Sequence, residues 1–80
     1  MMCMIDQITN DQRAAYAEHG LDAYAEFKEG RPVYDSVEAM AGDLICDLLH
    51  LIRSEGCDPL AVLRTAEMNF EAEEADEATN

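Results

Sequence analysis

Apolar side chains recur every three or four positions over much of the chain, which is the spacing of one face of an α-helix. The spacing is clearest between residues 36 and 54, at Val37, Met40, Ala41, Leu44, Leu48, Leu51 and Ile52. Ile45 and Leu49 widen this apolar face. We therefore predict a central helix over residues 36–54. Asp35 and Glu38 have the spacing of a capping box at its start.

A helix also precedes the central one. Thr9 and Gln12 form a capping-box pattern, which predicts a helix from about Asn10. We expect Gly20 to break or kink it, with a second helix over residues 21–29; one long helix interrupted at Gly20 is the alternative. Gly30 is the expected stop, followed by a loop over residues 30–36. The stripe expected to enter the core is Ala15, Tyr16, Tyr24 and Phe27.

The last helix is predicted to begin at Pro59. Gly56 suits the left-handed position that ends the central helix, Asp58 can cap the next one, and Pro59 fits its first turn. Leu60, Leu63, Ala66 and Phe70 would share one face. These patterns predict an all-α fold, a bundle-like single domain of three to four helices over residues 1–80. The expected core is Leu44, Leu48, Leu51, Leu63 and Phe70.

The end of the chain is acidic, with five carboxylates between residues 71 and 77. Glu67, Glu71 and Glu74 would stack along one helical face, where like charges repel. Anions are also disfavoured at a helix C-terminus by the helix dipole. We therefore expect residues 71–80 to form an acidic tail that frays unless a basic group compensates.

The whole composition is strongly acidic, with 18 Asp and Glu against five Lys and Arg and a formal net charge of −13. Such a charge repels nucleic acid and anionic membranes and favours a protein partner with a basic surface. The cysteines, Cys3, Cys46 and Cys57, have neither CxxC nor zinc spacing. With no signal-peptide pattern and no run of membrane-spanning length, we expect a cytoplasmic protein whose thiols are reduced and either buried or without a role.

Residues 40–70 carry the motifs "GDL" at 42–44, "GCDP" at 56–59 and "LRTAEMNF" at 63–70. They resemble the C-terminal half of MazG-type nucleotide pyrophosphohydrolases. The resemblance implies a helical fold that cleaves nucleoside triphosphates with Mg²⁺, which is held by acids of an E-x-x-E helix and an E-x-x-D helix. Asp43 matches the second pair, but Met40 stands where its partner acid is expected. Glu67 and Asn69 stand where that family has Asn and Lys.

Two further groups bear on a metal site. Glu26 and Glu29 form an E-x-x-E, but they lie next to Gly30 and do not align well with the family's pair. An alternative Mg²⁺ site is Asp43, Asp47 and His50, which share one helical face near Cys46. The other interpretation is that these side chains form the solvent face of a core helix. The departures at one site favour a protein that is not an enzyme and has no cofactor.

The preferred hypothesis is a small acidic binding protein that mimics nucleic acid. It would block the basic DNA- or RNA-binding surface of a host defence complex, as anti-CRISPR proteins of phages do, in the bacterial cytoplasm. A MazG-like protein that binds or hydrolyses nucleoside triphosphates with Mg²⁺ is the alternative, and a homodimer is compatible with either because the chain is short. The predicted partner-binding carboxylates are Glu67, Glu71, Glu73, Glu74, Asp76, Glu77, Asp22, Glu26 and Glu29.

Overall fold

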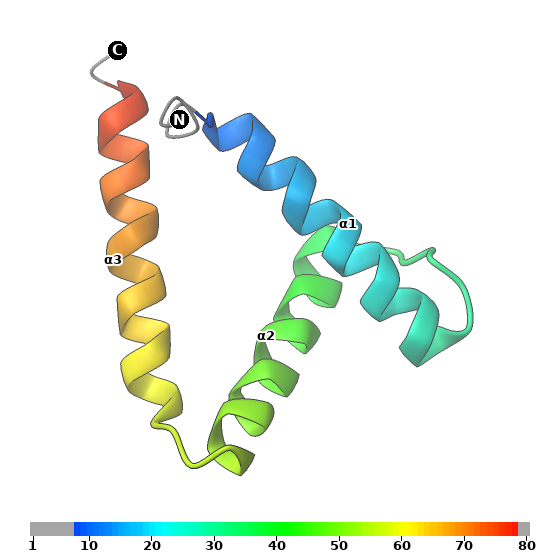
Figure 1. Ribbon diagram of the computed structural model, residues 1–80. Helices are drawn as coiled ribbons and strands as arrows, with labels where there is room; N and C mark the ends of the chain where they lie inside the picture. Colours follow the sequence, from blue (N-terminus) through cyan, green and yellow to red (C-terminus); the bar gives the residue numbers. More distant parts are fainter. Residues whose placement is uncertain (1–7, 79–80) are drawn as a thin grey trace, which may run out of the picture.

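The computed structural model describes residues 8–78, and over that range it contains three α-helices and no strand (Figure 1). They are α1 (Asn10–Glu29), α2 (Val37–Ser54) and α3 (Pro59–Ala78). The all-α prediction is therefore confirmed, with three helices. Within the described residues, no helix is both long and apolar enough to cross a membrane.

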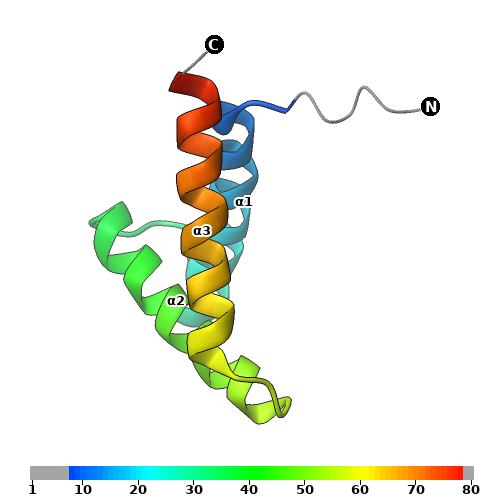
Figure 2. The same ribbon diagram turned by 90° about the vertical axis from the view of Figure 1, so that its left-hand side faces the viewer.

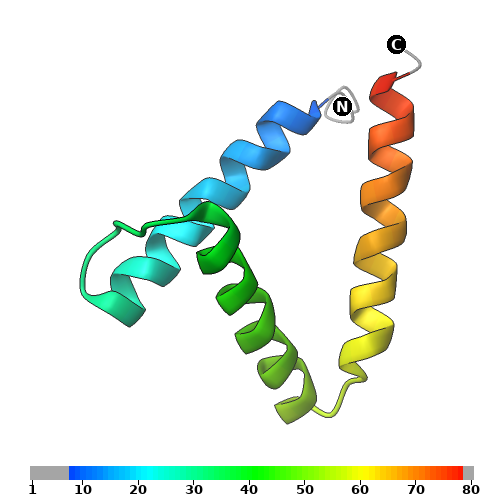
Figure 3. The same ribbon diagram turned by 180° about the vertical axis from the view of Figure 1, so that it is seen from behind.

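The three helices form the sides of an open triangle. α1 crosses the first turns of α2, α2 and α3 meet at the turn after Ser54, and the end of α3 returns to the start of α1 (Figures 1 and 3). α1 and α3 overlap in the view of Figure 2, but they meet only where the end of α3 contacts the start of α1 and diverge from there (Figures 1 and 3). This arrangement brings the last turns of the chain next to the first turn of α1.

The start of α1 has the predicted capping box. Thr9 Oγ1 accepts a hydrogen bond from the backbone N–H of Gln12 at 3.1 Å, and Gln12 Oε1 accepts one from Thr9 N at 2.8 Å. The break expected at Gly20 was wrong, because α1 runs through it without interruption. Glycine inside a helix costs about 1 kcal/mol relative to alanine. The burial of Leu21 and Ala25 in the following turn stabilises the continuous helix.

The other helix boundaries follow local side-chain and backbone chemistry. Gly30 ends α1 and Gly56 follows α2, both in the left-handed conformation, with φ of 86° and 84°. Asp58 Oδ1 accepts from Leu60 N at 3.1 Å and caps α3 ahead of Pro59, as predicted. The cap of α2 is different, because Ser36 rather than Asp35 fills it: Ser36 Oγ accepts from Ala39 N at 3.1 Å.

The core of the described residues is small. Its buried hydrophobic side chains are Leu21, Ala25 and Met40, where α1 crosses α2. Four partly buried side chains pack against them, from α1, from the 30–36 loop and from α2: Tyr24, Tyr34, Ala41 and Leu44. Packing therefore concentrates at one corner of the triangle.

Most of the residues predicted to form the core are not part of it. Leu48, Leu51 and Phe70 are 43%, 54% and 63% exposed, and only Leu44 and Leu63 of the predicted set are half-buried. Tyr16 and Phe27, also expected inside, are exposed. Helical spacing shows which side chains share a face, but burial requires a second element over that face. Across the open triangle, none of the described residues supplies that element.

Candidate functional site

The acidic C-terminal segment is helical through Ala78, and its last turns dock on the start of α1. The backbone N–H of Asn10 donates to Glu77 Oε2 at 2.6 Å, and Asn10 Nδ2 donates to the backbone oxygen of Glu73 at 3.1 Å. Arg13 Nε lies 3.4 Å from Glu73 Oε2. The positive end of the α1 dipole and one guanidinium thus face two carboxylates. This compensation explains why the predicted fraying is not observed up to Ala78.

The carboxylates of α3 divide between two faces. Glu73 and Glu77, four residues apart, face α1 and are bonded to it. Glu67, Glu71 and Glu74, spaced by four and three, share another face, and we call them the acidic stripe. All three are exposed, and none forms a hydrogen bond or an ion pair with another described residue. The stripe spans about 10 Å along the helix, at ~1.5 Å per residue.

The structure separates the nine predicted partner-binding carboxylates into two groups. Six lie on α3 from Glu67 onward, and Asp22, Glu26 and Glu29 lie on the C-terminal half of α1, which points away from the C-terminal half of α3 (Figures 1 and 3). Asp22 Oδ1 accepts a hydrogen bond from Tyr34 Oη at 3.0 Å. Partial burial, with this hydrogen bond, raises the pKa of Tyr34. The carboxylate of Asp22 is therefore engaged within the chain.

A second group of acids surrounds Lys28, and we call Tyr24, Lys28, Asp43 and Asp47 the Lys28 corner. Lys28 Nζ lies 3.6 Å from Asp43 Oδ2 and 4.0 Å from Asp47 Oδ2. Tyr24 Oη donates to Asp47 Oδ2 at 2.5 Å and accepts from Lys28 Nζ at 3.1 Å. The hydrogen bond to Asp47 raises the pKa of Tyr24, and the hydrogen bond to Tyr24 raises the pKa of Lys28.

The alternative Mg²⁺ site is not assembled in this arrangement. Asp43 and Asp47 converge on the ammonium of Lys28, whereas His50 lies at the junction with α3, beside Pro59 and Leu60. Over residues 8–78, no three His, Cys, Asp or Glu side chains come together as metal ligands would. The two cysteines in this range, Cys46 and Cys57, are free and exposed rather than buried; Cys3 lies outside it.

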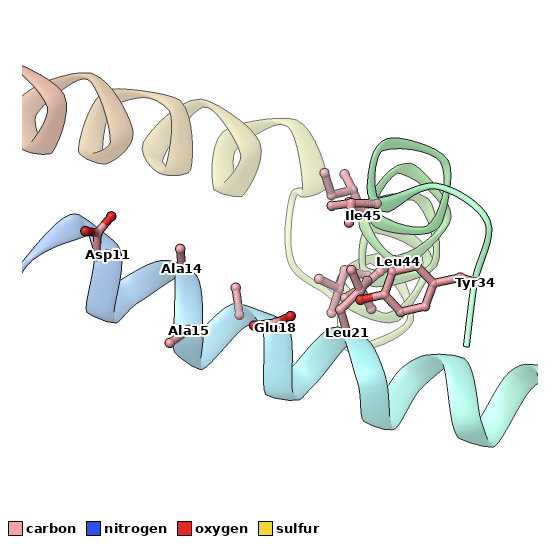
Figure 4. Close-up of a pocket in the computed structure, with 12 residues that line it drawn as sticks. Asp11, Ala14, Ala15, Glu18, Leu21, Tyr34, Leu44 and Ile45 are labelled. Carbon is pink, nitrogen blue, oxygen red and sulfur yellow. The ribbon is translucent and has the colours of Figure 1, made fainter. Parts of the chain in front are cut away.

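An apolar groove runs between α1 and α2, and it was not anticipated from the sequence. Its volume is about 670 Å³, and Figure 4 shows Leu21, Leu44 and Tyr34 at one end with Asp11 and Ala14 toward the other. Other apolar lining residues come from α2: Val37, Ala41, Ile45 and Leu48. The sequence feature that indicates this groove is the wide apolar face of α2, which includes Ile45. The same feature also predicts a buried core helix, so it does not by itself distinguish a groove from a core.

Comparisons of the chain with known protein families, with curated proteins and with solved structures gave no match. The resemblance of residues 40–70 to the pyrophosphohydrolases therefore remains a prediction. Met40, which stands where that family has an acid, is part of the buried core.

Proposed function

We propose that this protein is a small non-enzymatic inhibitor that presents the acidic stripe of α3 to a basic, nucleic-acid-binding surface of another protein complex. The observation that best supports this proposal is that Glu67, Glu71 and Glu74 are exposed on one helical face without a partner among the described residues. A guanidinium or ammonium from another protein can pair with these carboxylates, and it need not displace an internal cation.

The charge density of the stripe supports mimicry of nucleic acid. The three carboxylates are separated by two intervals of about 5 Å along the helix axis, which is of the same order as the ~3.4 Å between phosphates along one strand of duplex DNA. The docking of Glu73 and Glu77 on α1 holds the helix in place beneath the stripe. A fixed row of charges loses less conformational entropy on binding than a frayed tail would.

The inhibition would be competitive. Lys and Arg side chains that normally contact phosphates would pair with the stripe, and target DNA or RNA would be excluded from the same surface. The net charge of −13 would speed the encounter with a basic surface, and raised salt would weaken it. The setting we propose is a bacterial cytoplasm, with a defence complex of the kind that anti-CRISPR proteins inhibit as the target.

Nucleotide hydrolysis is the less favoured proposal. Lys28 Nζ lies within 4.0 Å of both Asp43 and Asp47 and offsets one of their two negative charges, which leaves these carboxylates less able to gather Mg²⁺ around a triphosphate. Release of pyrophosphate from a nucleotide mixture with Mg²⁺, abolished by Asp43→Ala, would favour this alternative over inhibition.

The test is affinity capture from a nuclease-treated bacterial lysate with the full chain as bait. We expect capture of a nucleic-acid-binding complex that moderate salt or added DNA releases. The stripe variant Glu67→Gln/Glu71→Gln/Glu74→Gln should lose most of this capture, at least tenfold.

The matched control is Asp35→Asn/Glu38→Gln/Glu55→Gln, which also removes three negative charges, but from exposed acids outside the predicted partner-binding set. Its capture should stay near that of the wild type. Equal loss with both variants would show that net charge alone drives binding, and full capture by the stripe variant would overturn the proposed site.

A further inference from the structure

The apolar face of α2 is unusually open for a folded protein. Val37, Ile45, Leu48 and Leu51 follow the spacing of one helical face, and they are 64%, 47%, 43% and 54% exposed. The first three also line the groove between α1 and α2. Exposed apolar side chains that are contiguous in this way mark a surface that another element covers.

The total surface of the 80-residue chain is large for its mass. The chain exposes 6424 Å², whereas a compact protein of 8.9 kDa exposes roughly 4,800 Å². Its radius of gyration is 14.8 Å, against about 12 Å for a compact domain of this length. Both values are totals for the 80-residue chain and include the nine residues outside the described range. The excess of ~1,600 Å² per chain, or ~3,200 Å² for two chains, is therefore the upper limit of the area that a partner could cover, and permanent homodimers bury about 2,000–5,000 Å².

The small core also requires a partner that is always present. Only Leu21, Ala25 and Met40 are buried hydrophobic side chains among the described residues. Burial of a large side chain contributes ~1.5–3 kcal/mol, whereas ordering each residue costs about 1.5 kcal/mol. A single chain therefore gains too little from packing. Its own second copy is the one partner available wherever the chain is made.

Charge permits this contact although each chain is strongly acidic. Of the residues that line the groove, Asp11 and Glu18 carry charge, and both belong to α1. The α2 residues that line it are all apolar. The nearby acids of α2, Asp43 and Asp47, already have Lys28 beside them. Two copies that meet along α2 therefore bring its apolar side chains together, while Asp11 and Glu18 lie on the α1 wall of the groove.

We propose that a second copy of this chain covers the groove, with the exposed face of α2 packed against the same face of its partner about a two-fold axis. The α1 and α2 helices of both copies then enclose one shared core. The acidic stripe lies on α3 and is not part of this interface. The proposed dimer and the proposed inhibition can therefore be tested independently, and failure of one does not contradict the other.

The test is the mass of the full chain in solution, measured by light scattering over a range of concentrations. We expect twice the 8.9 kDa chain mass at micromolar concentration and above, and a Tm that rises with concentration because folding and association are linked. A folded species of single-chain mass throughout, with a Tm independent of concentration, would overturn the proposal.

Single substitutions then locate the interface. Ile45→Lys and Leu48→Lys each place an ammonium in the groove while lowering the net negative charge. We expect each to raise the dimer dissociation constant at least tenfold through burial of a charge rather than through repulsion between acidic chains. Phe27→Lys, at a side chain 95% exposed on α1, is the matched control and should leave the mass unchanged.

A dimer that survives both groove variants would place the interface elsewhere and overturn the assignment. If a groove variant fails to fold at low concentration, its Tm at high concentration decides the matter. Partial recovery with concentration supports the interface, whereas a Tm that does not change overturns it. A wild-type monomer whose groove instead binds a basic amphipathic helix would also overturn it.

Discussion

Two pairs of acids in this chain have the same helical spacing and different surroundings. Asp43 and Asp47 lie four residues apart on α2, and Glu67 and Glu71 lie four residues apart on α3. Such like-charge pairs destabilise a helix by a few tenths of a kcal/mol. On α2, Lys28 of α1 reaches both carboxylates, and Tyr24 donates a hydrogen bond to one of them. On α3, no described cation reaches Glu67 or Glu71.

The difference shows that an acid's role depends on what the fold brings near it. The Lys28 corner uses its two carboxylates to attach α1 to α2, where the small core also lies. The acidic stripe keeps its repulsion, and a basic partner would relieve it. We therefore propose that the Lys28 corner stabilises the fold and that the acidic stripe serves recognition of a partner.

The largest effect we expect comes from the packing beside the Lys28 corner. Met40→Ala should lower the free energy of unfolding by about 2 kcal/mol, because it removes a buried side chain at the crossing of α1 and α2. Phe70→Ala, on exposed α3, should change it by less than about 0.5 kcal/mol. Urea denaturation at one fixed chain concentration measures both. Equal losses would mean that α3 contributes as much packing as the crossing does.

A smaller effect is expected at the glycine that ends α1. Gly30→Ala should cost about 1 kcal/mol, because φ at Gly30 is 86° and a Cβ is strained there. Gly30 follows Lys28 by two residues, so its conformation helps to place the corner. Gly20→Ala is the control: Gly20 is helical with open space around it, so alanine should stabilise the protein by ~0.5–1 kcal/mol. Thermal denaturation that shows the same sign for both would contradict this account.

Exchanging the charge environments of the two pairs should have a still smaller effect. Lys28→Met leaves Asp43 and Asp47 without their cation, so Tm should fall slightly. Glu71→Lys places a cation between Glu67 and Glu74, so Tm should rise slightly. Both changes should shrink in about 1 M NaCl, which screens exposed charges. Salt-independent shifts would show that packing, not charge, distinguishes the two regions.

The smallest effect at neutral pH concerns Tyr24. Its pKa is raised in the folded chain, chiefly by the hydrogen bond to Asp47, so the folded state holds the proton more tightly than the unfolded state does. The resulting stability is fully present below pH 10, the usual pKa of tyrosine, and is lost as pH rises through the higher folded value. Tyr24→Phe should reduce the loss of Tm that occurs as pH rises above 10, whereas Tyr16→Phe should not. A pH profile of Tm that is identical in both variants would contradict the role of the bond.

The local features of this fold were predictable from the sequence, because each depends on residues that are close in the chain. The capping box at Thr9 and Gln12, the left-handed glycines Gly30 and Gly56, and the cap at Asp58 are of this kind. Ser36 replaced Asp35 as a cap because adjacent residues that both favour the position compete for it.

Features that depend on how helices meet were not predictable in this way. The spacing of Leu48 and Phe70 indicated a shared apolar face but not whether another helix covers it. The stripe of Glu67, Glu71 and Glu74 followed from spacing alone. The contact of Glu77 with Asn10 did not, because it joins residues 67 positions apart in the chain.

The most direct measurement is the affinity of the protein for its captured, purified partner complex, determined over a series of salt concentrations with and without competing DNA. The account predicts that DNA displaces the protein and that affinity falls as salt rises. It also predicts that the stripe variant binds more weakly, and with a shallower salt dependence, than the Asp35/Glu38/Glu55 control variant. Simultaneous binding of protein and DNA, with an affinity that neither salt nor the stripe variant changes, would contradict it.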